Sequence, residues 1–198
     1  MVDRQLRRRG IEDERVLAAM EEVPRERFLP HEMRRRAYRD GAVRIGEGQT
    51  MSQPWIVACM AQLLELEGPE TVLEVGSGSG YAAAVLSRLC RAVVTIERFE
   101  SLATEAAEHL AALGYDNVEV RVGDGANGAP DRAPFGGISV TATALGAPPP
   151  ALFDQRAPGA ALVCPVERGG SEFLMRFRDD FEERIVPVRF VPLVSDEP

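Results

Sequence analysis

The sequence contains no lysine, because all 23 of its basic residues are arginine, against 31 acidic residues. Mechanisms that use a lysine Schiff base or a lysine general base are therefore excluded. Histidine is nearly absent as well. His31 and His109 both fall in patterns of exposed helix positions, so we expect neither to act as a strong general base. The net charge of −8 argues against nucleic acid as the main partner.

Cysteine is scarce, and long apolar runs are missing. Cys59, Cys90 and Cys164 form no C-x-x-C pair and lie in apolar runs, which is typical of buried thiols in a reducing cytoplasm. No segment is long and apolar enough to span a membrane, and no apolar segment typical of a signal peptide follows the charged N-terminus. We expect a cytoplasmic monomer with no metal site and no membrane contact.

The order of apolar segments predicts the fold class. The chain has 198 residues with 45% apolar content, which suits one globular domain. From residue 71 onward strands and helices alternate, as in a parallel sheet covered on both faces. Two alternating segments, 172–178 and 185–193, then predict an antiparallel pair at the sheet edge. We expect a doubly wound, mostly parallel, seven-stranded α/β sheet, with residues 1–66 as a helical lid and 67–198 as the core.

One stretch, Thr71–Tyr81, predicts a nucleotide-cofactor site. A buried strand ends in a glycine turn, and a helical pattern begins at once. Glycine lets the backbone pass close to a ligand, and the helix N-terminus offers unpaired N–H groups. The pattern is G-x-G-x-G, not the G-x-G-x-x-G of dinucleotide sites. It therefore disfavours a nicotinamide dehydrogenase.

Acidic residues end the next two predicted strands. Glu97 follows the apolar run 92–96, and Gly123-Asp124 follows 118–122. A carboxylate at the tip of a strand can accept both hydroxyls of a ribose. The glycine turn and these acids together resemble the S-adenosylmethionine site of class I methyltransferases. The alternative is an ordinary tight turn with surface acids.

Several further segments resemble one family, the protein-L-isoaspartate (D-aspartate) O-methyltransferases, in order along nearly the whole chain. The box at 48–54, Gly-Gln-Thr-Met-Ser-Gln-Pro, is specific to that family. The matching segments are Gln5–Leu6, Arg9–Ile11, Arg15–Leu17, Val23–Glu26, Ala37–Asp40, Ile45–Pro54, Val72–Tyr81, Ile96–Arg98, Leu113–Tyr115, Gly123–Gly125, Ala133–Phe135, Val140–Ala142 and Val188–Leu193.

The resemblance implies methyl transfer from S-adenosylmethionine to the free α-carboxylate of isoaspartyl (and D-aspartyl) residues in damaged proteins, whose ester then closes to a succinimide. A carboxylate with a pKa near ~3.9 is already a nucleophile at neutral pH, so no strong base is needed. Positioning and desolvation supply the catalysis. Ser52 resembles the family's active-site serine, which would orient the carboxylate. The alternative for Ser52 is a plain helix cap before Pro54.

The resemblance also implies which residues bind each ligand. We expect Glu97 to hold the ribose and Asp124 to face the adenine amino group. The residues expected to bind the cofactor are Gly76, Ser77, Gly78, Ser79, Gly80, Glu97, Arg98, Gly123, Asp124, Thr50 and Met51. Those expected to bind an extended peptide are Ile45, Gly48, Gln49, Thr141, Ala142 and Thr143.

Some positions depart from the family pattern. Ala129, Gly136 and Thr143 stand where the family usually has Trp, Asp and Ala, and we expect them near the substrate. They leave two alternatives open. One is a carboxylate methyltransferase for a dedicated peptide or small molecule, and the other is a cofactor-binding paralogue without catalysis.

Overall fold

The computed structural model describes residues 1–196 and contains one eight-stranded mixed sheet. Six strands run parallel, and two C-terminal strands add to one edge in antiparallel pairs. Seven strands lie in the order β10-β9-β8-β6-β3-β4-β5, and the short β7 pairs with β8, which confirms the predicted fold class. The strands are β3 Thr71–Val75, β4 Ala92–Glu97, β5 Val118–Val122, β6 Phe135–Val140, β7 Ala144–Leu145, β8 Arg156–Arg168, β9 Ser171–Arg178 and β10 Phe181–Pro187.

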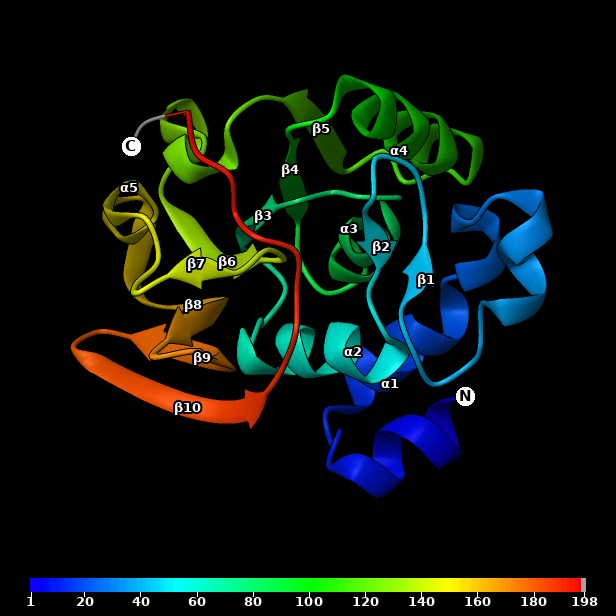
Figure 1. Cartoon of the computed structure of the whole chain (residues 1–198), viewed down its shortest axis with the longest axis horizontal. Coiled ribbons are helices and arrows are strands. Elements are labelled where there is room, and N and C mark those ends of the chain that lie inside the picture. Colours follow the sequence, from blue (N-terminus) through cyan, green and yellow to red (C-terminus); the bar gives the residue numbers. More distant parts are fainter. Residues whose placement is uncertain (197–198) are drawn as a thin grey trace.

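Helices cover both faces of the sheet (Figure 1). Successive residues of β3 point to opposite faces, so Val72 joins one hydrophobic core cluster and Leu73 joins the other. The first cluster includes residues of α1, α2 and α3, and the second includes Leu152 of α5. The helices are α1 Glu14–Glu22, α2 Pro54–Leu63, α3 Tyr81–Leu86, α4 Glu100–Ala112 and α5 Pro150–Asp154.

The N-terminal segment packs on the first face and also reaches the edge of the sheet where the strands end. Short helical turns span Val2–Leu6, Arg7–Arg9, Arg25–Phe28 and His31–Arg36. A small antiparallel pair, β1 Val43–Arg44 and β2 Thr50–Met51, then leads into α2 (Figure 1). Pro54 occupies the first turn of α2, where its missing N–H costs nothing.

The last predicted strand is wrong in its bounds. The spacing predicts 185–193, but β10 pairs with β9 only from Phe181 to Pro187. The chain then leaves the sheet and crosses the carboxyl ends of the strands (Figure 1). A single bridge between Thr143 and Pro192 fixes the crossing. Pro187 and Pro192 lack the backbone N–H that a longer ladder of hydrogen bonds between β10 and β9 would need.

The sheet has its topological switch point beside β3. The chain proceeds from β3 to β4 and β5, then returns to β6 on the other side of β3. Open α/β sheets bind ligands at the carboxyl ends of strands at such a point. No helix among residues 1–196 has the length and apolarity needed to cross a membrane.

Candidate active site

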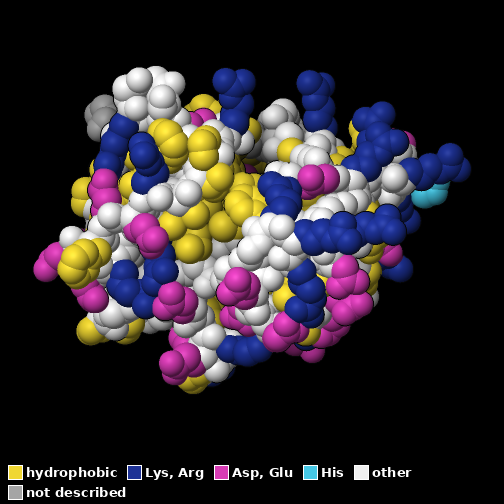
Figure 2. Space-filling view, turned by 90° about the horizontal axis from the view of Figure 1, so that it is seen from below, with side chains coloured by type: hydrophobic (Ala, Val, Ile, Leu, Met, Phe, Trp, Pro, Cys, Tyr) yellow, Lys and Arg dark blue, Asp and Glu magenta, His cyan; other side chains and the backbone are white. Residues whose placement is uncertain are grey.

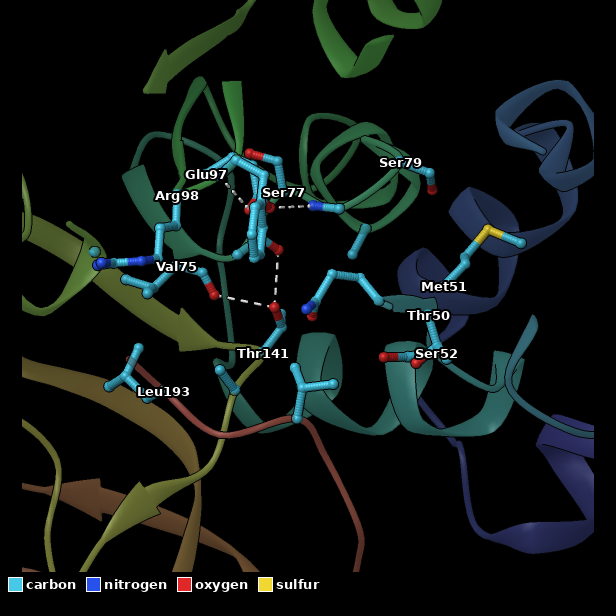
Figure 3. A pocket seen from close by; sticks show the side chains of 18 of the residues that line it. Thr50, Met51, Ser52, Val75, Ser77, Ser79, Glu97, Arg98, Thr141 and Leu193 are labelled. Carbon is cyan, nitrogen blue, oxygen red and sulfur yellow. Dashed lines mark hydrogen bonds between the residues drawn. The ribbon is translucent and has the colours of Figure 1, made fainter. Parts of the chain in front are cut away.

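A cavity of about 350 Å³ lies at this switch point. The glycine turn, the 48–52 box and the C-terminal crossing segment surround it (Figure 3). The lining residues are Gly48, Gln49, Thr50, Met51, Ser52, Val57, Val75, Gly76, Ser77, Gly78, Ser79, Tyr81, Ala82, Ile96, Glu97, Arg98, Phe99, Gly125, Thr141, Ala142, Val191, Pro192, Leu193 and Val194.

Thr141 holds the glycine turn in place. Its hydroxyl lies 2.8 Å from the Gly76 carbonyl and 3.0 Å from the Val75 carbonyl, and can donate to either (Figure 3). Its backbone N–H donates to the Val75 carbonyl at 2.8 Å. Gly76 has φ 95°, and a Cβ there would collide with the Thr141 hydroxyl. Glycine is therefore required at position 76 for both backbone conformation and space.

Glu97 is buried at the end of β4, and its carboxylate is partly used by the backbone. One oxygen accepts the Gly78 N–H at 2.8 Å, and the other accepts the Phe99 N–H at 3.1 Å. A carboxylate has about four acceptor positions. The positions left over can accept the two hydroxyls of a ribose, as the sequence predicts.

Asp124 contacts the C-terminal segment. Its oxygens accept the N–H groups of Ala126 at 2.9 Å and Asp196 at 2.8 Å, and the Ser195 hydroxyl at 3.2 Å. Burial would raise the pKa of Asp124, but these hydrogen bonds hold that pKa below its ordinary value. Gly125, not Gly123 or Asp124, lines the cavity.

The C-terminal segment is the part of the site that sequence reasoning missed. Residues 191–194 line the cavity. Arg98, which also lines it, donates to the Asp196 carboxylate at 2.6 Å. The segment's alternating apolar residues are typical of a strand, so the pattern carried no signal that it would cross the site.

Ser52 lies where the first cavity meets a second cavity of about 390 Å³. Gln53, not Ser52, is the N-cap of α2, and no side chain caps that helix, so the helix-cap alternative is wrong.

The residues lining the second cavity are Ala42, Thr50, Ser52, Gln53, Ile56, Thr141, Pro187, Val188, Arg189, Phe190 and Val191. Figure 2 shows hydrophobic side chains gathered on the face seen from below, where α2 and β10 lie.

Two of the residues expected to bind substrate, Thr143 and Ile45, line neither cavity. The Thr143 N–H donates to the Val191 carbonyl, and the Thr143 carbonyl accepts the Leu193 N–H, both at 2.8 Å. Thr143 thus clamps the crossing segment. Ile45 donates its N–H to Gln49 at 3.0 Å and shapes the β1–β2 connection.

Two departures from the family pattern lie away from the site, against expectation. Gly136 is near the start of β6, at the edge of the sheet opposite the cavity, and a Cβ there would collide with the Glu70 side chain. Ala129 is buried in the second core cluster, and its N–H donates to Gln155 at 2.7 Å. The partners of the two residues, Glu70 and Gln155, are distant along the chain, so no local pattern in the sequence indicates these contacts.

His109 also differs from its expected exposed position. Its Nδ1 lies 3.1 Å from the Ser79 carbonyl, and its ring packs edge-on against Phe28. It therefore supports the back of the glycine turn and lies outside the residues that line either cavity.

Comparisons with known proteins show the family to which the chain belongs. The model of the protein-L-isoaspartate(D-aspartate) O-methyltransferase family matches residues 1–198. A protein-L-isoaspartate O-methyltransferase of Roseiflexus castenholzii is 51% identical over 95% of this chain and 88% of its own length. The protein-L-isoaspartate O-methyltransferase 1 of Rhodopseudomonas palustris is 51% identical over 100% of this chain and 82% of its own.

Solved structures of the same family resemble nearly the whole chain. A Plasmodium falciparum structure described as a protein-L-isoaspartate O-methyltransferase in complex with S-adenosyl-L-homocysteine has a TM-score of 0.83 at 25% identity, covering 95% of this chain and 94% of that chain. A second protein-L-isoaspartate O-methyltransferase has a TM-score of 0.82 at 29% identity, over 96% of this chain and 64% of that chain. The chain therefore belongs to the protein-L-isoaspartate (D-aspartate) O-methyltransferase family of S-adenosylmethionine-dependent enzymes.

Proposed function

We propose that the two joined cavities hold the cofactor and the damaged peptide, and that the methyl group passes to the α-carboxylate of an isoaspartyl residue beside Ser52. The observation that carries this assignment is the junction itself. Thr50, Ser52 and Thr141 line both cavities. A carboxylate placed at this junction can face the cofactor in the first cavity while the rest of the peptide stays in the second cavity.

The residues of the first cavity fit S-adenosylmethionine. Its volume lies within the range of ligand pockets, roughly 300–1,000 Å³. Gly76 leaves the room that a side chain would fill, and Glu97 retains acceptor positions for a ribose. When bound, the cofactor supplies an electrophilic methyl group. The protein's residues bind it, orient the carboxylate and exclude water.

The acceptor needs no base. An isoaspartyl α-carboxylate is ionised at neutral pH, and the hydroxyl of Ser52 can donate a hydrogen bond that orients it. Since no proton must be removed, the absence of histidine from both cavity linings does not prevent the reaction. We assign Ser52 this orienting role.

The second cavity fits an extended peptide. The Val188 N–H donates to the backbone carbonyl of Glu172 at 3.0 Å, and the Phe190 N–H donates to the Glu172 carboxylate at 2.6 Å. In an extended chain successive N–H groups point to opposite sides. Arg189, which lies between Val188 and Phe190, lines the second cavity, and a peptide can pair with the backbone there as an added strand. Readout through the backbone accepts many flanking sequences.

Paired peptides test this function. The purified enzyme is incubated with methyl-labelled S-adenosylmethionine and peptides that differ only in isoaspartate or aspartate at one position. We expect strong methylation of the isoaspartyl peptide, weak methylation of the aspartyl peptide and broad tolerance of flanking residues. Equal methylation of both peptides would support a dedicated carboxylate substrate, and tight cofactor binding with no methylation would support a non-catalytic protein.

We also propose that the enzyme is a cytoplasmic monomer, with residues 1–66 as the substrate lid and 67–198 as the cofactor-binding core. The free, buried Cys59, Cys90 and Cys164 support a reducing compartment. Light scattering of the purified protein tests the oligomeric state, and cell fractionation tests the compartment. For the lid, the matching test is whether amide exchange within residues 1–66 slows when peptide is added to the cofactor complex.

A further inference from the structure

Arg25 is a fully buried arginine with no exposed surface at all. It begins the short helical turn Arg25–Phe28. Its Nε donates to the Ala37 carbonyl at 2.7 Å, and its Nη2 donates to the Ser52 carbonyl at 2.6 Å. Its guanidinium carbon lies 4.6 Å from the centre of the Tyr81 ring. Arg25 therefore contacts the backbone of the serine at the cavity junction and the first residue of α3.

The charge of Arg25 has no carboxylate partner within residues 1–196. Its Nη1 is buried without a hydrogen-bond partner. Burial lowers the pKa of Arg25, yet a guanidinium stays protonated in proteins. A buried cation without a counter-ion is costly, so the fold holds a positive charge that two carbonyls and the Tyr81 ring stabilise but that no carboxylate among residues 1–196 neutralises.

The position of this charge points to a role in the reaction. Arg25 joins the Ser52 backbone to the ring of Tyr81, which directly follows the glycine turn. The substrate brings an anion to Ser52, and the interior of a protein screens charges much less than water does. A buried cation behind the Ser52 peptide group therefore favours an ionised carboxylate in front of it.

We infer that Arg25 is a positioning residue that fixes Ser52 against the cofactor turn, and that its charge selects an ionised carboxylate over a neutral group at the acceptor position. This inference rests on the proposed role of the cavity junction. It goes beyond that role because Arg25 lines neither cavity. Arg25 acts on the substrate indirectly, by holding the backbone of Ser52 and by the electrostatic attraction between its guanidinium charge and the substrate carboxylate.

The test compares two ligands on one enzyme. Dissociation constants are measured for the isoaspartyl peptide and for the same peptide with its α-carboxylate replaced by a carboxamide, at saturating S-adenosylhomocysteine. We expect the unmodified enzyme to prefer the carboxylate. In Arg25→Met, which keeps an unbranched apolar stem and removes the charged guanidinium group, we expect that preference to shrink at least about tenfold, as one lost charge interaction at low dielectric allows. The value of kcat/KM should fall by about a hundredfold.

Arg156→Met is the matched control. Arg156 is partly buried, and like Arg25 it donates to two carbonyls and lies over an aromatic ring, that of Phe153, at 5.1 Å. Phe153 packs against the second core cluster, and Arg156 lines neither cavity. We expect Arg156→Met to lower thermal stability while leaving kcat/KM and the carboxylate preference unchanged.

Arg25→Lys separates charge from geometry and serves if Arg25→Met does not fold. Lysine keeps the charge but cannot hold two carbonyls in the fork geometry of arginine. We expect it to retain the carboxylate preference and to lose about tenfold in kcat. An Arg25→Lys enzyme with unchanged kcat overturns the positioning role.

An Arg25→Met enzyme that folds and keeps the full carboxylate preference overturns the electrostatic role. If the unmodified enzyme itself does not distinguish carboxylate from carboxamide, the proposed function fails instead. The two failures can therefore be told apart.

Discussion

The Glu97 carboxylate accepts the backbone N–H of Gly78 at 2.8 Å. This bond joins the end of β4 to the glycine turn that follows β3. Replacing Glu97 by Ala removes the proposed ribose acceptor and also the hydrogen bond to the glycine turn. Because each hydrogen bond to a charged group contributes about 1.5–3 kcal/mol, we expect the dissociation constant of the cofactor to rise tenfold or more.

Calorimetry with S-adenosylhomocysteine measures the effect of Glu97→Ala. Glu100→Ala, at an exposed position in the first turn of α4, is the control for removing one negative charge nearby. Unchanged cofactor affinity in Glu97→Ala would remove Glu97 from the site.

Replacing Ser52 by Ala should lower kcat and leave cofactor affinity nearly intact. One lost orienting hydrogen bond in a site shielded from water costs on the order of 1–3 kcal/mol in transition-state stabilisation. Steady-state kinetics at saturating cofactor, with the exposed Ser171→Ala as control, check this. A variant that binds cofactor poorly but turns over normally when saturated contradicts the assigned role.

Glu74 should make stability depend on pH. It is fully buried on the same face as α2 and α3, and its Oε2 accepts the Thr95 hydroxyl at 2.6 Å. Burial raises the pKa of Glu74 to about 8. Between the pKa of the unfolded chain, ~4.3, and this value, the folded protein holds a proton that the unfolded chain has lost. The stabilisation is therefore complete below ~4.3 and is lost as pH rises through about 8.

The expected slope for Glu74 is a loss of about 1.4 kcal/mol in unfolding free energy per pH unit across that window. Glu74→Gln keeps the shape without the titrating proton, so its stability should fall less steeply from pH 5 to pH 8. Urea unfolding at several pH values measures both slopes, and the exposed Glu183→Gln is the control. Identical slopes for the Glu74→Gln variant and the unmodified protein would show that Glu74 does not hold the proton.

Asp124 should control how long the cofactor stays bound. It anchors the crossing segment through the Asp196 N–H, and that segment lines the cavity. In Asp124→Ala we expect the dissociation rate of S-adenosylhomocysteine to rise about tenfold, because hydrogen bonds to a charged acceptor are lost. Stopped-flow measurements with the exposed Asp116→Ala as control test this. An unchanged rate would mean that the segment is held by its other contacts.

Local patterns in the sequence were enough to predict much of the fold and the cofactor side of the site. An apolar run, a glycine turn and a helix occupy consecutive residues, and Glu97 ends the next apolar run. Such features depend on side-chain period and on the backbone freedom of glycine, both of which are properties of short segments. The parallel order followed because strands alternated with helices.

Only the tertiary structure decided where the remaining pieces lie. The segment 188–194 has the composition of a strand, and its path across the cavity depends on the bonds of Thr143 and Asp124. Gly136 lies far from the site because of the direction of β6, and Arg25 reaches Ser52 across 27 positions in sequence. These contacts join residues distant along the chain, so no periodicity or local spacing encodes them; they form when helices and sheet pack together.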